Sequence, residues 1–191
     1  MSESKKNTCL KRAFSLLGPS PTNKFGPKAT SVLDTDDGQA VQSSGKILKW
    51  SNAPESVLII KKFDVDLVEP FIKCATWLLK DQGLKVFVEK AVLSEDVVIN
   101  HEKFKTISKD LSTFTGCSCI DLIVCLGGDG TLLYAASLFQ HSMPPVVPFH
   151  MGSLGFMTSH IFSNFEETLK NVFNGKASMM LRSRLRCILT K

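Results

Sequence analysis

From residue 56 onward, the apolar residues follow two alternating patterns. Short apolar or alternating runs, typical of strands, occupy residues 57–60, 84–88, 122–126 and 146–149. Apolar side chains recur at helical spacing over residues 67–82, 131–140 and 162–173. Residues 94–115 are polar and ambiguous, and 177–189 resemble one more strand. This alternation predicts an α/β fold of the Rossmann-like type, a doubly wound parallel sheet with helices on both faces.

The first quarter of the chain has a different pattern. Residues 1–50 are rich in Pro, Gly, Ser and Thr, without a sustained apolar period, and carry 8 Lys/Arg against 4 Asp/Glu. We therefore expect residues 1–52 to form a disordered basic tail, followed by an α/β domain over 53–177. Residues 178–191 would begin a second, β-rich domain. Because residues 51–191 carry 15 Lys/Arg against 14 Asp/Glu, we expect no nucleic-acid partner.

The N-terminal tail contains the sequence features that indicate where the protein is located in the cell and whether it is phosphorylated. No apolar run reaches the roughly 18 residues of a membrane span, so we expect no membrane partner. The chain start lacks a secretory apolar core, which favours a cytosolic protein and leaves a transit peptide as the alternative. Arg12 lies three residues before Ser15, a spacing that suits a basophilic protein kinase but also arises by chance in a basic tail. Six cysteines without a framework pattern are interpreted as core or loop thiols.

A glycine turn follows the apolar run at 122–126. Gly127, Gly128 and Gly130 surround Asp129, and a helical run begins at Thr131. A strand, a glycine turn and a helix start offer free backbone N–H groups to a phosphate, with a carboxylate beside them. The nucleotide P-loop needs a Lys after its last glycine, where this chain has Thr131. The dinucleotide pattern G-x-G-x-x-G fails at its third glycine, which is Leu133.

Asp129 has two interpretations. At the positive end of a helix it would be ionised and could accept a proton from an attacking hydroxyl. The same position suits an ordinary N-cap. Asp121 lies roughly 26 Å away, at about 3.3 Å per residue of strand, so the two carboxylates cannot share a metal ion. We therefore predict no protein-held metal, and expect Mg²⁺ to arrive on the phosphates of a nucleotide.

A second glycine turn, at residues 152–156, follows the strand predicted at 146–149. Because both turns follow strands of one parallel sheet, we expect them to meet at its carboxyl edge. His150 is either structural or part of the site, and Phe156 either a core ring or a wall of a base pocket. Three arginines alternate along the last predicted strand and could form a solvated face or grip phosphate: Arg182, Arg184 and Arg186.

Two blocks of sequence carry a family resemblance. Residues 126–133 (LGGDGTLL) are shared in outline with diacylglycerol-type lipid kinases and phosphofructokinases. With residues 148–158 (PFHMGSLGFMT), they resemble the NAD kinase family much more specifically. Residues 26–29 (GPKA) and 182–185 (RSRL) resemble its eukaryotic cytosolic branch. The resemblance extends over roughly residues 14–191.

The resemblance implies transfer of a phosphoryl group from ATP to the adenosine-ribose 2′-hydroxyl of NAD, giving NADP. It implies that Asp129 accepts the proton of that hydroxyl. Gly128, Gly130 and Thr131 would line the phosphate-binding turn, and Leu133 and Phe156 would wall the adenine pocket. The family also implies a homo-oligomer.

The chain departs from the family after the first domain. NAD kinases carry a second, β-rich domain with an Asn-Glu or Asn-Asp motif that grips NAD, and no such pair follows the glycine turns here. The sequence therefore predicts a truncated NAD kinase. The alternatives are an inactive isoform that binds full-length subunits and a diacylglycerol-type lipid kinase, which would show a different second glycine motif.

Overall fold

A six-stranded parallel sheet forms the centre of the computed structural model, which describes residues 23–33, 46–116, 119–139, 142–152 and 154–182. Every neighbouring pair in this sheet is parallel. In spatial order the strands are β6 (Ser112–Thr113), β5 (Lys85–Val88), β4 (Ser56–Lys61), β7 (Leu122–Leu126), β8 (Val146–His150) and β9 (His160–Ile161). Numbered along the chain this order is 3-2-1-4-5-6, the Rossmann arrangement, which confirms the predicted fold class.

Alternate residues of each strand point to opposite faces of the sheet. On β4, Val57 and Ile59 belong to a core that includes residues of α1 (Val68–Thr76) and α6 (Phe165–Phe173). Leu58 and Ile60 belong to a second core with α5 (Asp129–Leu138). Because both faces are buried, the strands consist of nearly continuous apolar residues.

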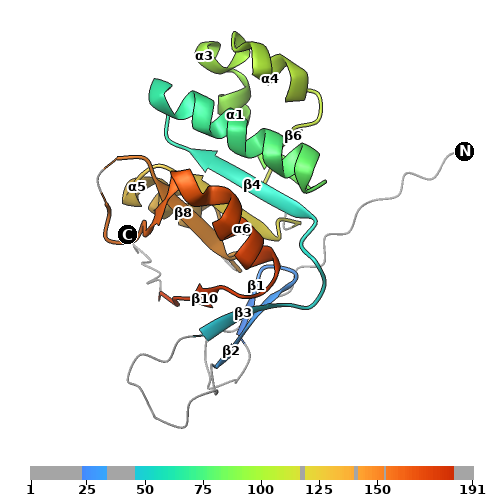
Figure 1. Cartoon of the computed structure of the whole chain (residues 1–191), viewed down its shortest axis with the longest axis vertical. Helices are drawn as coiled ribbons and strands as arrows, with labels where there is room; N and C mark the ends of the chain where they lie inside the picture. The colour runs from blue at the N-terminus through green and yellow to red at the C-terminus, as the bar shows by residue number, and fades with distance from the viewer. Residues whose placement is uncertain (1–22, 34–45, 117–118, 140–141, 153, 183–191) are drawn as a thin grey trace, which may run out of the picture.

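Two of the predicted helices are divided into shorter segments. The predicted helix over 67–82 is divided into η1 (Val65–Leu67), α1 and the π-helical turn η2 (Trp77–Asp81). The one over 162–173 begins as η3 (Phe162–Asn164) before α6. The ambiguous stretch after β5 contains three short helices, which lie beside α1 at one end of the molecule (Figure 1): α2 (Lys90–Leu93), α3 (Asp96–Ile99) and α4 (Glu102–Ile107).

A second, antiparallel sheet lies at the opposite end of the molecule (Figure 1). Its strands, in spatial order, are β1 (Asn23–Phe25), β2 (Ala29–Leu33), β3 (Lys46–Trp50) and β10 (Ser178–Met179). The prediction of disorder over residues 1–52 was therefore wrong for 23–33 and 46–50. Residues 1–22 and 34–45, and the candidate phosphosite Ser15 with them, lie outside the described residues.

The small sheet was missed because its apolar contacts are distant in sequence. Ala29 and Leu48 are 1% and 2% exposed and belong to the same core as α1 and α6. The Trp50 indole N–H donates to the Val172 carbonyl oxygen over 2.7 Å. The strands themselves are short and partly polar, so no local period marks them. Since β10 pairs with β3, the chain near residue 178 joins a sheet that begins at residue 23, across the predicted domain boundary.

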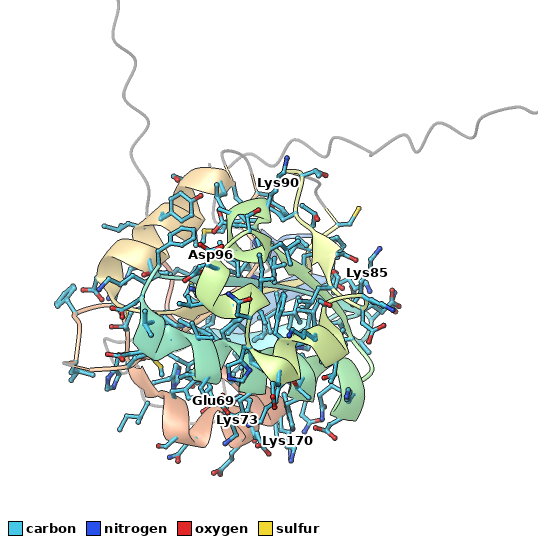
Figure 2. All side chains as sticks on the ribbon, turned by 90° about the horizontal axis from the view of Figure 1, so that it is seen from above. Glu69, Lys73, Lys85, Lys90, Asp96 and Lys170 are labelled. Atoms are coloured by element: carbon cyan, nitrogen blue, oxygen red, sulfur yellow. The ribbon has the colours of Figure 1, made fainter. Side chains whose placement is uncertain are left out.

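Charged side chains cover the helices and point outward (Figure 2). Glu69 and Lys73 from α1 lie on the same side of the molecule as Lys170 from α6. The core contains two of the cysteines: Cys74 and Cys125 are buried, and burial raises the pKa of Cys125 to about 12. For these two cysteines the prediction of core thiols is confirmed. Within the described ranges, no helix is both long and apolar enough to span a bilayer.

Candidate active site

The two glycine turns meet at the carboxyl edge of the parallel sheet, as predicted. β7 and β8 are neighbours, with Leu126 opposite Phe149, and each leads into one turn. The first turn also lies beside the end of β4, where the Lys62 amide donates to the Leu126 carbonyl oxygen over 3.0 Å. The chain runs outward from β4 to β5 on one side, and β7 lies on the other. The first glycine turn therefore lies at the topological switch point, where open α/β sheets bind ligands.

Helix α5 begins at Asp129, two residues earlier than predicted. Gly128 is the N-cap, and its carbonyl oxygen accepts hydrogen bonds from the Thr131 and Leu132 amides at 3.0 and 3.3 Å. The interpretation of Asp129 as the N-cap is therefore wrong. The Asp129 side chain does not cap the helix and instead extends to the second glycine turn. The first amides of a helix lack partners within it, so the backbone around Gly130 presents donors and the positive end of the dipole.

The carboxylate of Asp129 is bound by the segment that follows the second glycine turn. Its Oδ2 accepts from the Phe156 amide at 2.9 Å, and its Oδ1 accepts from the Met157 amide at 3.0 Å. Thr158 donates to Oδ1 twice, from its amide and its hydroxyl, each over 3.1 Å. Desolvation alone would raise the pKa of Asp129, but these hydrogen bonds outweigh it and lower the pKa below its ordinary value. Asp129 is thus ionised at neutral pH.

The three glycines of the first turn do different things. Gly127 has φ +151°, and a Cβ there would overlap the Thr131 hydroxyl, so this glycine is required by the turn itself. At Gly128 and Gly130 an added Cβ would meet nothing within 4 Å. Open space therefore faces the backbone at these two positions, beside the half-buried Thr131.

Leu133 and Phe156, the predicted walls of an adenine pocket, are exposed. They are 59% and 85% accessible, which excludes the alternative that Phe156 is a core ring. The Arg182 guanidinium lies over the Phe156 ring, 5.1 Å from its centroid, in a cation–π contact. Arg184 and Arg186 lie outside the described residues, so their predicted shared face is not described.

His150 has a local role at the start of the second turn. Its Nδ1–H donates to the Gly152 carbonyl oxygen over 3.1 Å. This bond helps fix the turn and favours the structural interpretation of the histidine.

Asp121 lies at the other end of β7, at the amino edge of the sheet. Its Oδ2 accepts from the Glu55 and Ser56 amides at 2.8 and 3.1 Å, and it pairs with Lys28 at 3.2 Å. Lys28 belongs to the turn between β1 and β2, so this pair ties the small sheet to the parallel one. Among the described residues, no three His, Cys, Asp or Glu side chains gather to hold a metal ion.

Sequence reasoning missed two groups beside the site. Lys62 follows β4, and a Cβ added to Gly127 would lie 3.3 Å from its Cβ; its ammonium, 63% exposed at the side chain, pairs with Asp64 at 3.1 Å. Thr158 belongs to the second sequence block and is fully buried against Asp129. The position of Lys62 right after the first strand of a doubly wound sheet was the available signal. A single threonine in a loop gives none.

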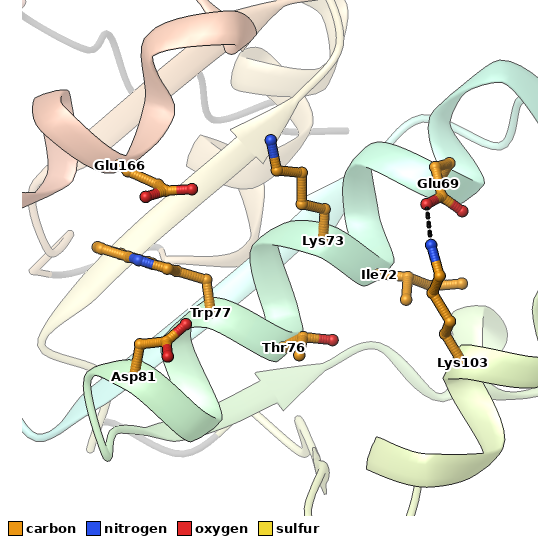
Figure 3. A pocket seen from close by; sticks show the side chains of 8 residues that line it. All are labelled: Glu69, Ile72, Lys73, Thr76, Trp77, Asp81, Lys103 and Glu166. Atoms are coloured by element: carbon orange, nitrogen blue, oxygen red, sulfur yellow. Dashed lines mark hydrogen bonds and ion pairs between the residues drawn. The ribbon is translucent and has the colours of Figure 1, made fainter.

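A separate open pocket of about 370 Å³ lies between α1, η2, α4 and α6. Trp77 forms part of its wall, Lys73 points into it, and Lys103 pairs with Glu69 at 2.7 Å (Figure 3). None of its lining residues belongs to either glycine turn. It therefore takes no part in the site around Asp129.

Comparison with known proteins identifies the family. The family profile described as the ATP-NAD kinase N-terminal domain matches residues 57–177. The chain belongs to the NAD kinase family. The match covers the parallel sheet, both glycine turns and α6, which are the elements that position Asp129.

Relatives from plants and yeast share this NAD kinase domain. A probable NAD kinase 1 of Oryza sativa subsp. japonica is 42% identical over 148 residues, which are 74% of this chain and 27% of the relative. An NAD(+) kinase of Saccharomyces cerevisiae is 51% identical over 67 residues, 35% of this chain and 13% of the relative. The crystal structure of a yeast NADH kinase complexed with NADH superposes with a TM-score of 0.61 and 27% identity, over 70% of this chain and 40% of that one. The chain thus spans about a quarter of the length of the rice relative.

Proposed function

We propose that this chain provides the catalytic corner of an NAD kinase, which transfers the terminal phosphoryl group of ATP to the adenosine-ribose 2′-hydroxyl of NAD and forms NADP. The observation that carries the proposal is the carboxylate of Asp129, held ionised at the start of α5 where two glycine turns meet. Family membership supports the same chemistry.

Asp129 is the proposed proton acceptor. Phosphoryl transfer requires little covalent chemistry from the protein, so positioning the nucleophilic hydroxyl is the main task of such a residue. The lowered pKa keeps the carboxylate ionised, so it can accept the hydroxyl's hydrogen bond. As the ribose oxygen bonds to phosphorus and the bond to ADP breaks, the hydroxyl proton passes to Asp129.

The backbone of the first turn is the proposed phosphate cradle. The space in front of Gly128 and Gly130 lets a phosphate approach the amides at the start of α5, with Thr131 beside it. Lys62 lies at the same edge and supplies a cation that the turn itself lacks. It occupies the role that a P-loop lysine has in other nucleotide sites.

Leu133 and Phe156 are the proposed apolar walls for the adenine. Both are exposed at the edge where the turns meet, and Phe156 presents a ring of which 85% is accessible. An exposed aromatic ring beside a phosphate site is suited to stacking a base. Arg182, over the same ring, would sit near the nucleotide.

A divalent cation would be carried by the nucleotide. Both oxygens of Asp129 accept protein N–H or O–H groups, and Asp121 lies at the far end of β7. The described carboxylates therefore suit a cation held mainly by the triphosphate. Such a cation neutralises charge on the transferred phosphoryl group when bound.

We further propose a cytosolic location and a homo-oligomeric assembly, both of which rest on the resemblance to the eukaryotic cytosolic branch.

The proposal is tested by incubating the purified chain with NAD, ATP and Mg²⁺ and measuring NADP enzymatically. NADP formation that requires all three components supports it, and Asp129→Asn is the matched control for a contaminating kinase. Phosphorylation of diacylglycerol in place of NAD would contradict it. Absence of NADP would contradict the claim that this chain alone is a kinase.

A further inference from the structure

The two oxygens of the Asp129 carboxylate have unequal environments. Oδ1 accepts three hydrogen bonds, from the amides of Met157 and Thr158 and from the Thr158 hydroxyl. Oδ2 accepts one, from the Phe156 amide. A carboxylate oxygen has about two lone-pair sites, so Oδ1 is saturated while Oδ2 retains capacity for one more donor.

The second glycine turn is shaped around this carboxylate. A Cβ added at Gly155 would overlap both Asp129 Oδ1 and the Thr158 hydroxyl. At Gly152, three residues earlier, an added Cβ would meet nothing within 4 Å. Neither glycine has a positive φ, so the difference between them is the space occupied by the carboxylate and not backbone strain.

Among the described residues, Thr158 is the one side chain that donates a hydrogen bond to the carboxylate. It is fully buried, and its hydroxyl faces Oδ1 and not solvent. The other three donors are backbone amides, which any residue except proline would supply. Two side-chain features of this segment therefore determine how it binds the Asp129 carboxylate: the Thr158 hydroxyl and the absence of a Cβ at Gly155.

We propose that Thr158 and Gly155 are positioning residues, which fix Oδ1 of Asp129 so that Oδ2 alone is presented to the substrate hydroxyl. The inference deepens the proposed function by naming the oxygen that receives the proton. In the transfer, the hydroxyl proton moves to Oδ2, the ribose oxygen forms its bond to phosphorus, and the electron pair of the breaking P–O bond leaves with ADP. Thr158 and Gly155 act through Asp129 and touch no substrate.

The charged and titratable groups on the surrounding elements are few among the described residues. Lys62 approaches from the end of β4, beside Gly127. His150 lies at the end of β8 and bonds Gly152, and Arg182, after β10, stacks on Phe156. None of the three forms an ion pair with Asp129, so the hydrogen-bond donors of residues 156–158 dominate its protonation.

The decisive experiment measures the carboxyl titration of Asp129 by ¹³C-detected NMR in the whole chain and four variants. We expect Thr158→Val and Gly155→Ala to shift the midpoint upward, because each removes hydrogen bonds to the charged form. Thr158→Ser restores the hydroxyl and Gly152→Ala alters the same turn without overlap, so both should titrate as the unmodified chain does. Circular dichroism and thermal unfolding identify any variant that fails to fold.

A second readout separates positioning from packing. Where the chain forms NADP, Thr158→Val should lower kcat by about 10-fold with KM nearly unchanged, and Thr158→Ser should recover it. Thr158→Val titrating like the unmodified chain, or Val and Ser shifting equally, would overturn the inference. Because the titration needs no turnover, a normal response of Asp129 without NADP formation would overturn only the proposed function.

Discussion

Two aspartates at opposite ends of β7 show how one residue type serves two purposes. Asp121, at the amino edge, is 2% exposed, accepts two backbone amides and pairs with Lys28. Asp129, just past the carboxyl edge, accepts amides and a hydroxyl, retains capacity for one more donor on Oδ2 and pairs with no described cation. Both carboxylates join segments distant in sequence. The difference is that Asp121 is buried with its counter-ion Lys28, while Asp129 lies beside the open space at Gly128 and Gly130.

Both carboxylates accept several hydrogen bonds, so the number of bonds does not distinguish a structural carboxylate from a catalytic one. Burial and the presence of a counter-ion do. Loss of the buried Asp121 carboxylate would deprive the Glu55 and Ser56 amides of their acceptor and leave Lys28 with the exposed Glu55 alone, so it should lower stability. A carboxylate held by neutral donors at an open edge keeps its charge available to a ligand. The two sites should therefore respond in opposite ways to the same substitution.

The largest effect is expected from Asp129→Asn. Removing the proton acceptor should reduce NADP formation by about 10²–10⁴-fold, the usual contribution of a general base. The fold should persist, because an amide oxygen can still accept from the second turn. Rates from coupled NADP assays and melting curves check both parts. Undiminished turnover would contradict the proposed role of Asp129 as the proton acceptor.

Asp121→Asn should have the reverse consequences. Lys28 is 19% exposed and would lose its buried partner, so unfolding free energy should fall by about 1–3 kcal/mol. Urea titrations followed by tryptophan fluorescence measure the loss. Activity per folded molecule should be unaffected, and a variant that is stable but inactive would count against the structural role.

Phe156→Ala sharpens the comparison at the open edge. The ring is 85% exposed, so we expect stability to change by less than about 0.5 kcal/mol. If the ring stacks on adenine, nucleotide affinity should fall by roughly 10-fold, equivalent to about 1.4 kcal/mol. Calorimetry with ATP and with NAD gives the affinities. Leu154→Ala, at a neighbouring side chain that is 71% exposed, is the matched control for general loss of apolar surface.

The smallest effect is a dependence on pH. The folded-state pKa of Asp129 is lowered, so its stabilising bonds are fully present above the ordinary carboxyl range. They are lost as pH falls through the lowered value. The stability difference between the unmodified chain and Asp129→Asn should therefore shrink in acid. Melting temperatures measured from pH 7 downward check this, and a difference that widens in acid would refute the assigned direction.

The parallel sheet could be predicted from sequence because each of its features is local. Buried runs such as 122–126, and the turns that follow them, are readable within ten residues. The rule that ligands bind beyond the carboxyl ends of parallel strands then predicts that both glycine turns lie at the same edge.

The small sheet and the hydrogen bonds to Asp129 depend on contacts between residues distant in sequence, which no local pattern predicts. Ala29 and Leu48 gain their burial from a core contributed by later helices, so β2 and β3 looked like tail. The four donors to Asp129 lie almost thirty residues away, and only the three-dimensional path of the second turn shows that they converge. The N-cap interpretation of Asp129 failed because the helix begins at Asp129 itself, with Gly128 as its N-cap, and the carboxylate accepts from the second turn instead.

The pairing of β10 with β3 has a consequence for how the chain is made. Ile47 leaves the ribosome long before Ser178, its partner across the small sheet. Closing so long a loop costs entropy that the neighbouring parallel sheet must first offset by folding. Until Met179 is synthesised, β3 lacks its partner on one edge, so the small sheet cannot be completed before that point.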